Sequence, residues 1–262
     1  MPYPAADPHG EPRMFPIRDH NPSQGTPFVT YVLILINVAI HFWQVSSIQS
    51  EVQLYRLYDA YAMIPAEISA GQDLLTLVTS TFLHGGWMHL IGNMLFLWIF
   101  GDNLEEALGR AGFLAFYLLG GIGAGLCQWA GGPQSPIPTV GASGAIAAVM
   151  GGYLLLFPKA KVDVLIFIII LIRIIPIPAW IMLALWFVLQ VFGGFAADPL
   201  TGGVAYWAHA GGFAIGFVMM VPAWLKRGGA AWWSRTDGHP PHPDAQWGAL
   251  TPSRVPEVRR RR

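Results

Sequence analysis

Long apolar segments alternate with short polar ones along most of the chain. Six of the apolar segments come close to the roughly 20 residues that an α-helix needs to cross a bilayer. We expect these transmembrane helices near residues 28–45, 82–101, 112–131, 141–157, 177–194 and 203–225. The pattern therefore predicts an all-α polytopic membrane protein, a bundle of six transmembrane helices.

A further apolar segment, VLIFIIILI (164–172), is too short for a transmembrane helix. It ends at Arg173, and Pro176 and Pro178 follow within a few residues. Nine helical residues rise only ~14 Å, about half the thickness of the hydrocarbon core. We expect this segment to be interfacial or re-entrant and to lead into the fifth span.

The composition agrees with a membrane protein. The chain is 54% hydrophobic and 11% charged, whereas soluble domains have about 25% charged residues. A net charge of zero gives no reason to expect nucleic acid as a partner, so the lipid bilayer is the partner that the composition indicates. The single cysteine, Cys127, permits no intrachain disulfide.

The charged residues divide the chain into three parts. Residues 1–27 are polar and proline-rich, without the apolar core of a signal peptide, and we expect a flexible cytoplasmic extension. Residues 28–226 would form the transmembrane domain. Residues 227–262 contain Gly-Gly and Pro-Pro pairs and end in four arginines, which predicts a flexible basic cytoplasmic tail.

The distribution of basic residues predicts the orientation of the bundle. With six spans, fourteen of the fifteen Lys and Arg residues lie on the same side of the membrane as the N-terminus, and Arg56 lies on the other side. Cytoplasmic loops carry the excess of basic residues in membrane proteins. We therefore expect both termini in the cytoplasm, and the absence of an organelle-targeting segment favours a bacterial inner membrane.

Several polar side chains lie within the predicted spans, where a polar group is costly and marks a candidate functional site. They are His84, His89, Asn93, Ser143 and His209. Spans two, four and six run in the same direction, from outside to inside. Ser143 begins span four, and His209 lies about six residues, or ~9 Å, into span six. These side chains therefore share the outer half of the membrane.

A serine beside a histidine can act as a nucleophile with its general base. Because no Asp or Glu lies within a span, Ser143 and His209 would form a dyad without a third acid. His89 and Asn93 are four residues apart, on one helix face. Together with the backbone N–H of Ser143 at a helix N-terminus, they are candidate donors to an oxyanion.

Small residues accompany the serine and the histidine. Gly144 follows Ser143, and Gly212 and Gly216 share the helix face of His209. Small faces let two helices approach closely in lipid, so we expect spans four and six to pack closely and bring His209 to Ser143. The alternative that these glycines belong only to packing motifs remains open.

Other functions are also open. His84, His89 and His209 would be a three-histidine metal site, but no carboxylate is nearby to orient them, and we expect no metal and no cofactor. A non-enzymatic membrane binding protein or a proton-handling transporter is the alternative from another class. Such a protein would tolerate replacement of Ser143 by Ala. A pseudoprotease would normally lack the serine or the histidine.

The ordered motifs resemble the rhomboid family of intramembrane serine proteases over about residues 15–225. They are PIRDHNP, FLHGGWMHLIGNMLFLWIFGDNLE, GRAGFLAFYLLGG, GASGAI and AHAGGFAIG, the last matching the family pattern AHxxGxxxG. The resemblance implies a six-helix rhomboid-like bundle in which Ser143 is the nucleophile and His209 the base and then the acid. It implies oxyanion stabilisation by His89, Asn93 and the Ser143 backbone.

The resemblance also implies cleavage of transmembrane protein substrates near their outer membrane boundary, without a metal or cofactor. In the mechanism that we expect, the fifth span and residues 195–202 are candidates for a mobile gate. The chain departs from the family in two places. Leu75 and Thr76 stand where many members have Trp-Arg, and Ala147 stands where some members stack a tyrosine on the histidine. The resemblance therefore leaves open what fixes the ring of His209.

Overall fold

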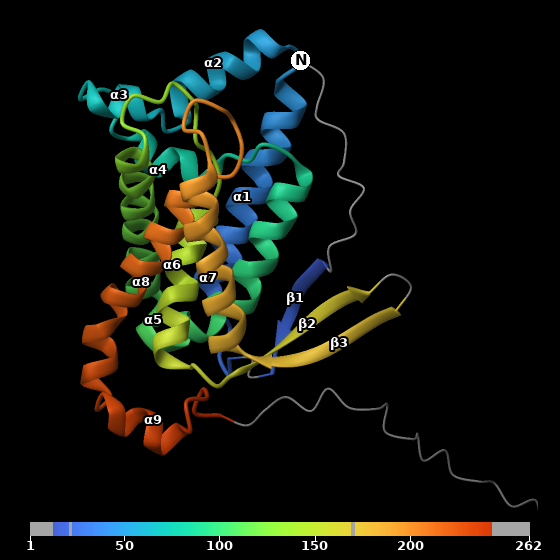
Figure 1. Cartoon of the computed structure of the whole chain (residues 1–262), viewed down its shortest axis with the longest axis vertical. Coiled ribbons are helices and arrows are strands. Elements are labelled where there is room, and N and C mark those ends of the chain that lie inside the picture. The colour runs from blue at the N-terminus through green and yellow to red at the C-terminus, as the bar shows by residue number, and fades with distance from the viewer. Residues whose placement is uncertain (1–12, 21–22, 169–170, 243–262) are drawn as a thin grey trace, which may run out of the picture.

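The structure is a computed structural model that describes residues 13–20, 23–168 and 171–242. Figure 1 shows a bundle of helices with a small sheet and α9 at its lower end and α2 and α3 at its upper end. The elements in chain order are β1 (Arg13–Asp19), α1 (Phe28–Ser47), α2 (Glu51–Tyr61), α3 (Pro65–Ser69), α4 (Thr76–Thr79), the 3-10 helix η1 (Ser80–Phe82), α5 (Trp87–Gly131), α6 (Ser143–Leu156), β2 (Lys161–Ile168), β3 (Leu171–Pro178), α7 (Ala179–Ala196), α8 (Tyr206–Lys226) and α9 (Ala230–Thr236).

The predicted class, a mainly helical polytopic membrane protein, is confirmed. Among the described residues, four helices are long and apolar enough to cross a membrane, namely α1, α5, α7 and α8. Helices α1 and α7 expose large apolar side chains, including Leu35, Phe42, Leu189 and Phe192. In a soluble protein such faces would need a covering partner, whereas in a membrane they contact lipid.

Helix α5 contains two of the predicted spans. Gly109 has left-handed dihedral angles (φ 72°, ψ 163°) that interrupt the helix between residues 87–108 and 110–131. Figure 1 shows that the chain reverses direction there, at the lower end of the bundle. Glycine suits this turn because it adopts positive φ without a steric cost. Six crossings remain a prediction, since α6 is a helix of only 14 residues.

Helix α6 forms the centre of the bundle. Twelve of its fourteen residues are buried, and it packs most extensively against α8 and α5. A helix that is apolar on all sides is typical of a central position. The contact with α8 is close because Gly216 lies directly on the backbone of Ala148, and a methyl group on Gly216 would overlap that carbonyl.

The sheet is the main departure from the expected all-helical fold. Strands β2 and β3 form an antiparallel hairpin, and β1 pairs antiparallel with β2. The segment 164–172, expected to be interfacial or re-entrant, belongs to this hairpin apart from residues 169–170, which lie outside the described residues. Its run of valine and isoleucine has high β propensity, which favours strands over a short helix.

Both terminal extensions include ordered elements. Within the predicted flexible extension 1–27, residues 13–19 form β1, and residues 1–12 lie outside the described residues. Within the predicted tail 227–262, residues 230–236 form α9, and residues 243–262 lie outside the described residues.

Helix α9 contacts the C-terminal end of α6. The indole N–H of Trp233 donates to the carbonyl of Leu155 (2.9 Å), and that of Trp232 donates to the carbonyl of Leu156 (3.2 Å). The last carbonyls of a helix have no partner within the helix. The two tryptophans therefore satisfy carbonyls at the end of α6 opposite to Ser143.

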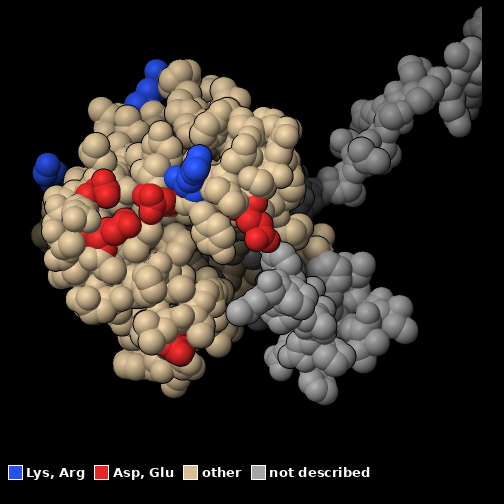
Figure 2. Space-filling model, turned by 90° about the horizontal axis from the view of Figure 1, so that it is seen from above, with Lys and Arg blue, Asp and Glu red and all other residues tan. Residues whose placement is uncertain are grey.

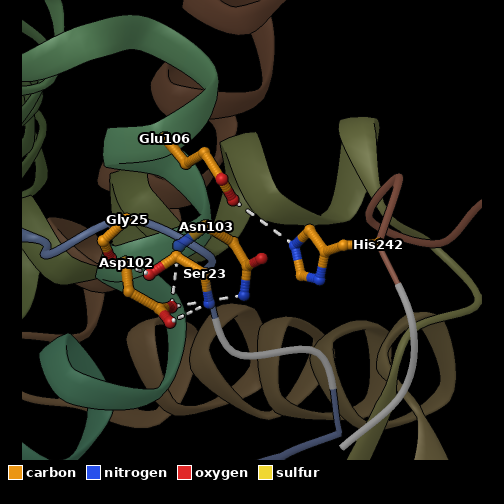
Figure 3. A network of polar contacts seen from close by, with 6 residues as sticks. All are labelled: Ser23, Gly25, Asp102, Asn103, Glu106 and His242. Carbon is orange, nitrogen blue, oxygen red and sulfur yellow. Dashed lines mark hydrogen bonds and ion pairs between the residues drawn. The ribbon is translucent and has the colours of Figure 1, made fainter.

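Acidic residues near the end of the first arm of α5 bind segments from both ends of the chain. Asp102 accepts a hydrogen bond from the backbone N–H of Ser23 (2.9 Å), and Glu106 lies 3.4 Å from His242 (Figure 3). The buried Glu105 accepts hydrogen bonds from the backbone N–H groups of Val29 and Thr30, both at 2.8 Å. Glu105 thus caps the first turn of α1, where the backbone N–H groups lack helical partners.

The two ends of the bundle differ in charge. Figure 2, which views the upper end, shows charged side chains as separate spots on a mostly uncharged surface. From the end of α1 to α4, the chain carries four acidic residues and one basic residue: Glu51, Asp59, Glu67, Asp73 and Arg56. The lower end, around the Gly109 turn, β2 and α9, carries most of the basic residues, including Arg110, Lys159, Lys161, Lys226, Arg227 and Arg235, beside acidic residues that include Asp102, Glu105, Glu106, Asp163 and Asp237.

Candidate active site

Ser143 is the first residue of α6, directly after a strained turn. Gly141, two residues earlier, has a φ of 129°, a region that side-chain-bearing residues avoid. Its backbone N–H donates to the carbonyl of Ser80 (2.9 Å), which ties the turn to η1. The backbone N–H of Ser143 belongs to the first turn of α6, where such groups have no helical partner and attract negative charge.

His209 lies in the first turn of α8 and contacts the serine directly. Its Nε2 atom is 2.8 Å from Ser143 Oγ, within hydrogen-bond distance. Gly212, one turn later, makes this approach possible because a methyl group there would overlap the carbonyl of Gly144. The structure therefore brings together Ser143, His209, Gly144 and Gly212 at one contact between α6 and α8.

Two side chains of helix α7 contact the other side of the His209 ring. Gln190 Oε1 lies 2.9 Å from His209 Nδ1, and Gln190 Nε2 donates to the carbonyl of Trp186 (3.3 Å). The Trp186 ring lies 5.8 Å from the His209 ring at an angle of 32°. Trp186 thus packs near the imidazole, while the position one helical turn after the serine holds the small, fully buried Ala147.

His89 approaches the serine from α5. The backbone N–H of Gly85 points at His89 Nδ1 (3.4 Å), which requires a lone pair on that nitrogen and leaves the proton of a neutral ring on Nε2. A methyl group on Gly141 would lie 2.7 Å from Nε2 of His89, and 3.6 Å from Ser143 Oγ. The absence of a side chain at Gly141 therefore gives His89 room beside the serine.

Asn93 lies one turn after His89 on α5 and is 7% exposed. Its amide nitrogen, Nδ2, has no hydrogen-bond partner among the residues that the structure describes. A buried donor without a partner costs about 1–3 kcal/mol. Such a donor is therefore available to an oxygen atom that enters the site.

Within the described ranges, no hydrogen bond or ring contact joins His84 to Ser143 or His209, and His84 does not line the cavity beside the serine. It is fully buried, and its ring packs edge-on against His89 at 5.2 Å. Its backbone carbonyl accepts a hydrogen bond from Gln44 of α1 (3.0 Å). His84 therefore belongs to the packing behind His89.

A cavity of about 1060 Å³ opens beside the serine. Its lining includes His89, Asn93, Ser143, Trp186 and His209, together with apolar side chains of α5 and α6. The residues after α7, 197–205, also border the cavity. This volume accommodates several residues of an extended peptide.

A metal site finds no support in the described parts of the chain. Within residues 13–20, 23–168 and 171–242, no group of three or more His, Cys, Asp or Glu side chains is arranged to hold a metal ion. The rings of His84, His89 and His209, which the three-histidine alternative would use, do not form such a group.

Three residues at this site were not predicted from the sequence: Gly141, Trp186 and Gln190. Gln190 had a visible signal, because it is the polar residue in the apolar run AWIMLALWFVLQVFGGFA. Trp186 lies four residues earlier, on the same helix face, but an aromatic residue in a transmembrane helix is common and carries no such signal. The role of Gly141 depends on the conformation of its turn, which the sequence does not specify.

Comparison with known proteins gives a family assignment. The family model of the rhomboid domain matches residues 71–226, which include every residue of the candidate site. The chain is also similar to rhomboid protein 1, mitochondrial, of Saccharomyces cerevisiae, with 30% identity over 196 residues, 72% of this chain and 51% of the relative.

Two further relatives come from a plant and a bacterium. Rhomboid-like protein 11, chloroplastic, of Arabidopsis thaliana is 39% identical over 118 residues, 44% of this chain and 37% of the relative. Rhomboid protease AarA of Providencia stuartii is 28% identical over 157 residues, 54% of this chain and 55% of the relative. The chain thus spans between 37% and 55% of the length of these three relatives.

Proposed function

Because the chain belongs to the rhomboid family, we propose that it is an intramembrane serine endopeptidase that cleaves transmembrane protein substrates near their outer membrane boundary. The observation that carries the proposal is the 2.8 Å contact between Ser143 Oγ and His209 Nε2 inside a membrane-spanning bundle. The cavity beside this contact supplies room for a peptide. The relative AarA, named as a rhomboid protease, supports the same activity.

In the first half of the reaction, Ser143 Oγ attacks the carbonyl carbon of the scissile peptide bond, and His209 Nε2 accepts the hydroxyl proton. The carbonyl oxygen becomes an oxyanion. Asn93 Nδ2, His89 Nε2 and the backbone N–H of Ser143 are the donors that stabilise it. The unpartnered amide of Asn93 and the tautomer of His89 set by Gly85 support these roles.

In the second half, the protonated His209 gives its proton to the leaving amine, and the C–N bond breaks to leave an acyl-enzyme on Ser143. Water then attacks the acyl carbon while His209 again takes a proton. The tetrahedral intermediate collapses, the acid product leaves, and Ser143 regains its proton from His209. No metal or cofactor takes part in this scheme.

The charge distribution supports an orientation for the proposed protease. The lower end, which carries β1 and α9, would face the cytoplasm, and the end that carries α2 and α3 would face outward. The site lies at the starts of α5, α6 and α8, toward that outward end (Figure 1). We place the protein in a bacterial inner membrane, with 28–226 as the transmembrane domain and the two arms of α5 as separate crossings.

Substrates would enter from the membrane between the first arm of α5 and α7. Helices α7 and α8 pack together, whereas α7 makes no extensive contact with α5 among the described residues. Residues 197–205 follow α7 and border the cavity, so α7 and this loop are the candidate gate. A transmembrane substrate would unwind locally there and present an extended strand to Ser143.

The proposal is tested by proteolysis in liposomes. The wild-type protein is reconstituted with a labelled single-span substrate whose transmembrane segment contains helix-destabilising residues, and the products are mapped by mass spectrometry. We expect cleavage near one membrane boundary, loss of cleavage in Ser143→Ala and His209→Ala, and unchanged cleavage in Ser46→Ala, an exposed serine of α1. Substrate binding without cleavage by the wild type would instead indicate a non-enzymatic binding protein.

A further inference from the structure

The second ring nitrogen of His209 has its own partner. Gln190 Oε1 lies 2.9 Å from His209 Nδ1, and Gln190 is only 9% exposed. The other end of the same amide donates to the carbonyl of Trp186, one helical turn earlier on α7. Because the amide nitrogen is engaged by a carbonyl, the amide oxygen is the atom that faces His209.

This contact determines which nitrogen of His209 carries the proton. An amide oxygen accepts hydrogen bonds, so Nδ1 must be the N–H donor of the neutral ring. The lone pair then lies on Nε2, which faces the hydroxyl of Ser143 at 2.8 Å. A general base needs this tautomer, because only a free lone pair can accept the serine proton.

Other groups around His209 do not supply the same contact. Ser143 faces it from α6, His89 faces it from α5, and the Trp186 ring packs near it from α7. The carboxylate of Asp198 lies in the loop that borders the cavity and accepts a hydrogen bond from the backbone N–H of Leu200. Gln190 is thus the partner that α7 presents to Nδ1.

We propose that Gln190 is the positioning residue of His209, so that the site works as a Ser-His pair oriented by a neutral amide. This inference rests on the proposed protease function. In serine proteases the third residue holds the imidazole in the correct tautomer and orientation. A neutral amide performs this task within a membrane, where a buried carboxylate would cost much more free energy than a glutamine.

The test compares variants of Gln190 by the rate at which a fluorescent fluorophosphonate labels Ser143 between pH 5 and pH 9. Gln190→Met removes the acceptor with little change in volume. Gln190→Glu keeps an acceptor oxygen and adds a negative charge. Asn37→Leu is the matched control, because it removes a fully buried amide that donates to the carbonyl of Leu33 on the same helix, interacts with Tyr117 of α5 and has no contact with Ser143 or His209 among the described residues.

We expect Gln190→Met to label roughly 100-fold more slowly at every pH, the effect of a displacement of about 1 Å at a reacting group. We expect Gln190→Glu to label within a few-fold of the wild type at high pH. The fall in its labelling rate toward low pH should begin at a higher pH than in the wild type, because the added negative charge favours the protonated imidazole of His209. Asn37→Leu should keep the wild-type profile.

Two results would overturn the inference about Gln190 and leave the proposed protease function intact. One is a wild-type labelling rate in Gln190→Met together with an unshifted pH dependence of labelling in Gln190→Glu. The other is a slower labelling rate in Gln190→Met that Asn37→Leu reproduces, while the pH dependence of Gln190→Glu is unshifted. If Gln190→Met fails to fold, the pH profile of Gln190→Glu decides. If the wild type is not labelled at Ser143, the proposed function itself fails, which is a distinguishable result.

Discussion

Replacing the buried side chain of Asn93 can distinguish a catalytic role of this residue from a structural one. Its Nδ2 atom has no partner within the described chain, so removing it breaks no internal hydrogen bond of that atom. We predict that Asn93→Ala lowers kcat for substrate cleavage by about 100- to 1000-fold, the usual effect of losing one oxyanion donor. KM should change little, because the interaction forms mainly in the transition state.

The measurement is steady-state cleavage in liposomes, with thermal unfolding as the control for folding. A kcat equal to that of the wild type would show that Asn93 does not donate to the oxyanion. A fall in unfolding temperature that accounts for the lost activity would assign Asn93 a structural role instead.

Gly141 gives a second prediction at the scale of single residues. A methyl group there would lie 2.7 Å from His89 Nε2, and the φ of 129° disfavours any side chain. We predict that Gly141→Ala slows fluorophosphonate labelling by roughly 100-fold, because His89 or the turn before Ser143 must move by about 1 Å. Gly25→Ala is the control, since Gly25 has open space around it and a permissive φ; equal rates in both variants would contradict the prediction.

At the scale of elements, the contact between α6 and α8 determines whether Ser143 and His209 meet. A methyl group on Gly216 would overlap the backbone of Ala148. We predict that Gly216→Ala destabilises the protein by about 1–3 kcal/mol, the usual cost of overpacking, and slows labelling of Ser143. Gly92→Ala on α5, which meets open space, should leave the free energy of unfolding unchanged or raise it. Equal stability of the two variants in detergent unfolding would refute this account of the contact.

Glu105 gives a test of how α1 is held. It caps the first turn of α1 and accepts three hydrogen bonds, from the backbone of Val29 and from both the backbone and the hydroxyl of Thr30. We predict that Glu105→Ala lowers the free energy of unfolding by about 3 kcal/mol, because hydrogen bonds to a charged group contribute about 1.5–3 kcal/mol each. The neighbouring Glu106→Ala should cost less than 1 kcal/mol in the same unfolding experiment, since its side chain is 37% exposed.

The sequence predicted the helices better than the sheet. Transmembrane helices leave a strong signal, because about 20 consecutive apolar residues satisfy both the helix length and the lipid. The hairpin of β2 and β3 leaves a weaker one, because a continuous apolar run without alternation fits a buried strand and a short helix equally. The pairing of β1 with β2 joins residues about 150 positions apart, and no local pattern encodes it.

At the scale of the whole molecule, the proposed orientation predicts which end a membrane-impermeant thiol reagent reaches. In intact cells that express a Cys127→Ala background, we expect a cysteine at Ser50, before α2, to react from outside. A cysteine at Ser234, in α9, should react only after the membrane is permeabilised, because the basic end is expected to face the cytoplasm. The opposite pattern would reverse the orientation.

The candidate site shows what a sequence conveys about a membrane enzyme. Ser143, His209, His89 and Asn93 could be singled out because polar residues in apolar spans stand out. Their grouping followed from the common direction of three helices. The contact of Gln190 with His209 was not foreseen, because it depends on the rotation of α7 about its axis, which packing with α8 determines.

The central claim is that Ser143 is an activated nucleophile, and reaction with a fluorophosphonate tests it most directly. The folded wild-type protein is treated in detergent and in several lipids, and the modified residue is identified by mass spectrometry beside Ser143→Ala and His209→Ala. We predict a covalent adduct on Ser143 that is absent in Ser143→Ala and strongly reduced in His209→Ala. An unlabelled wild type, or equal labelling of Ser143→Ala, would contradict the claim.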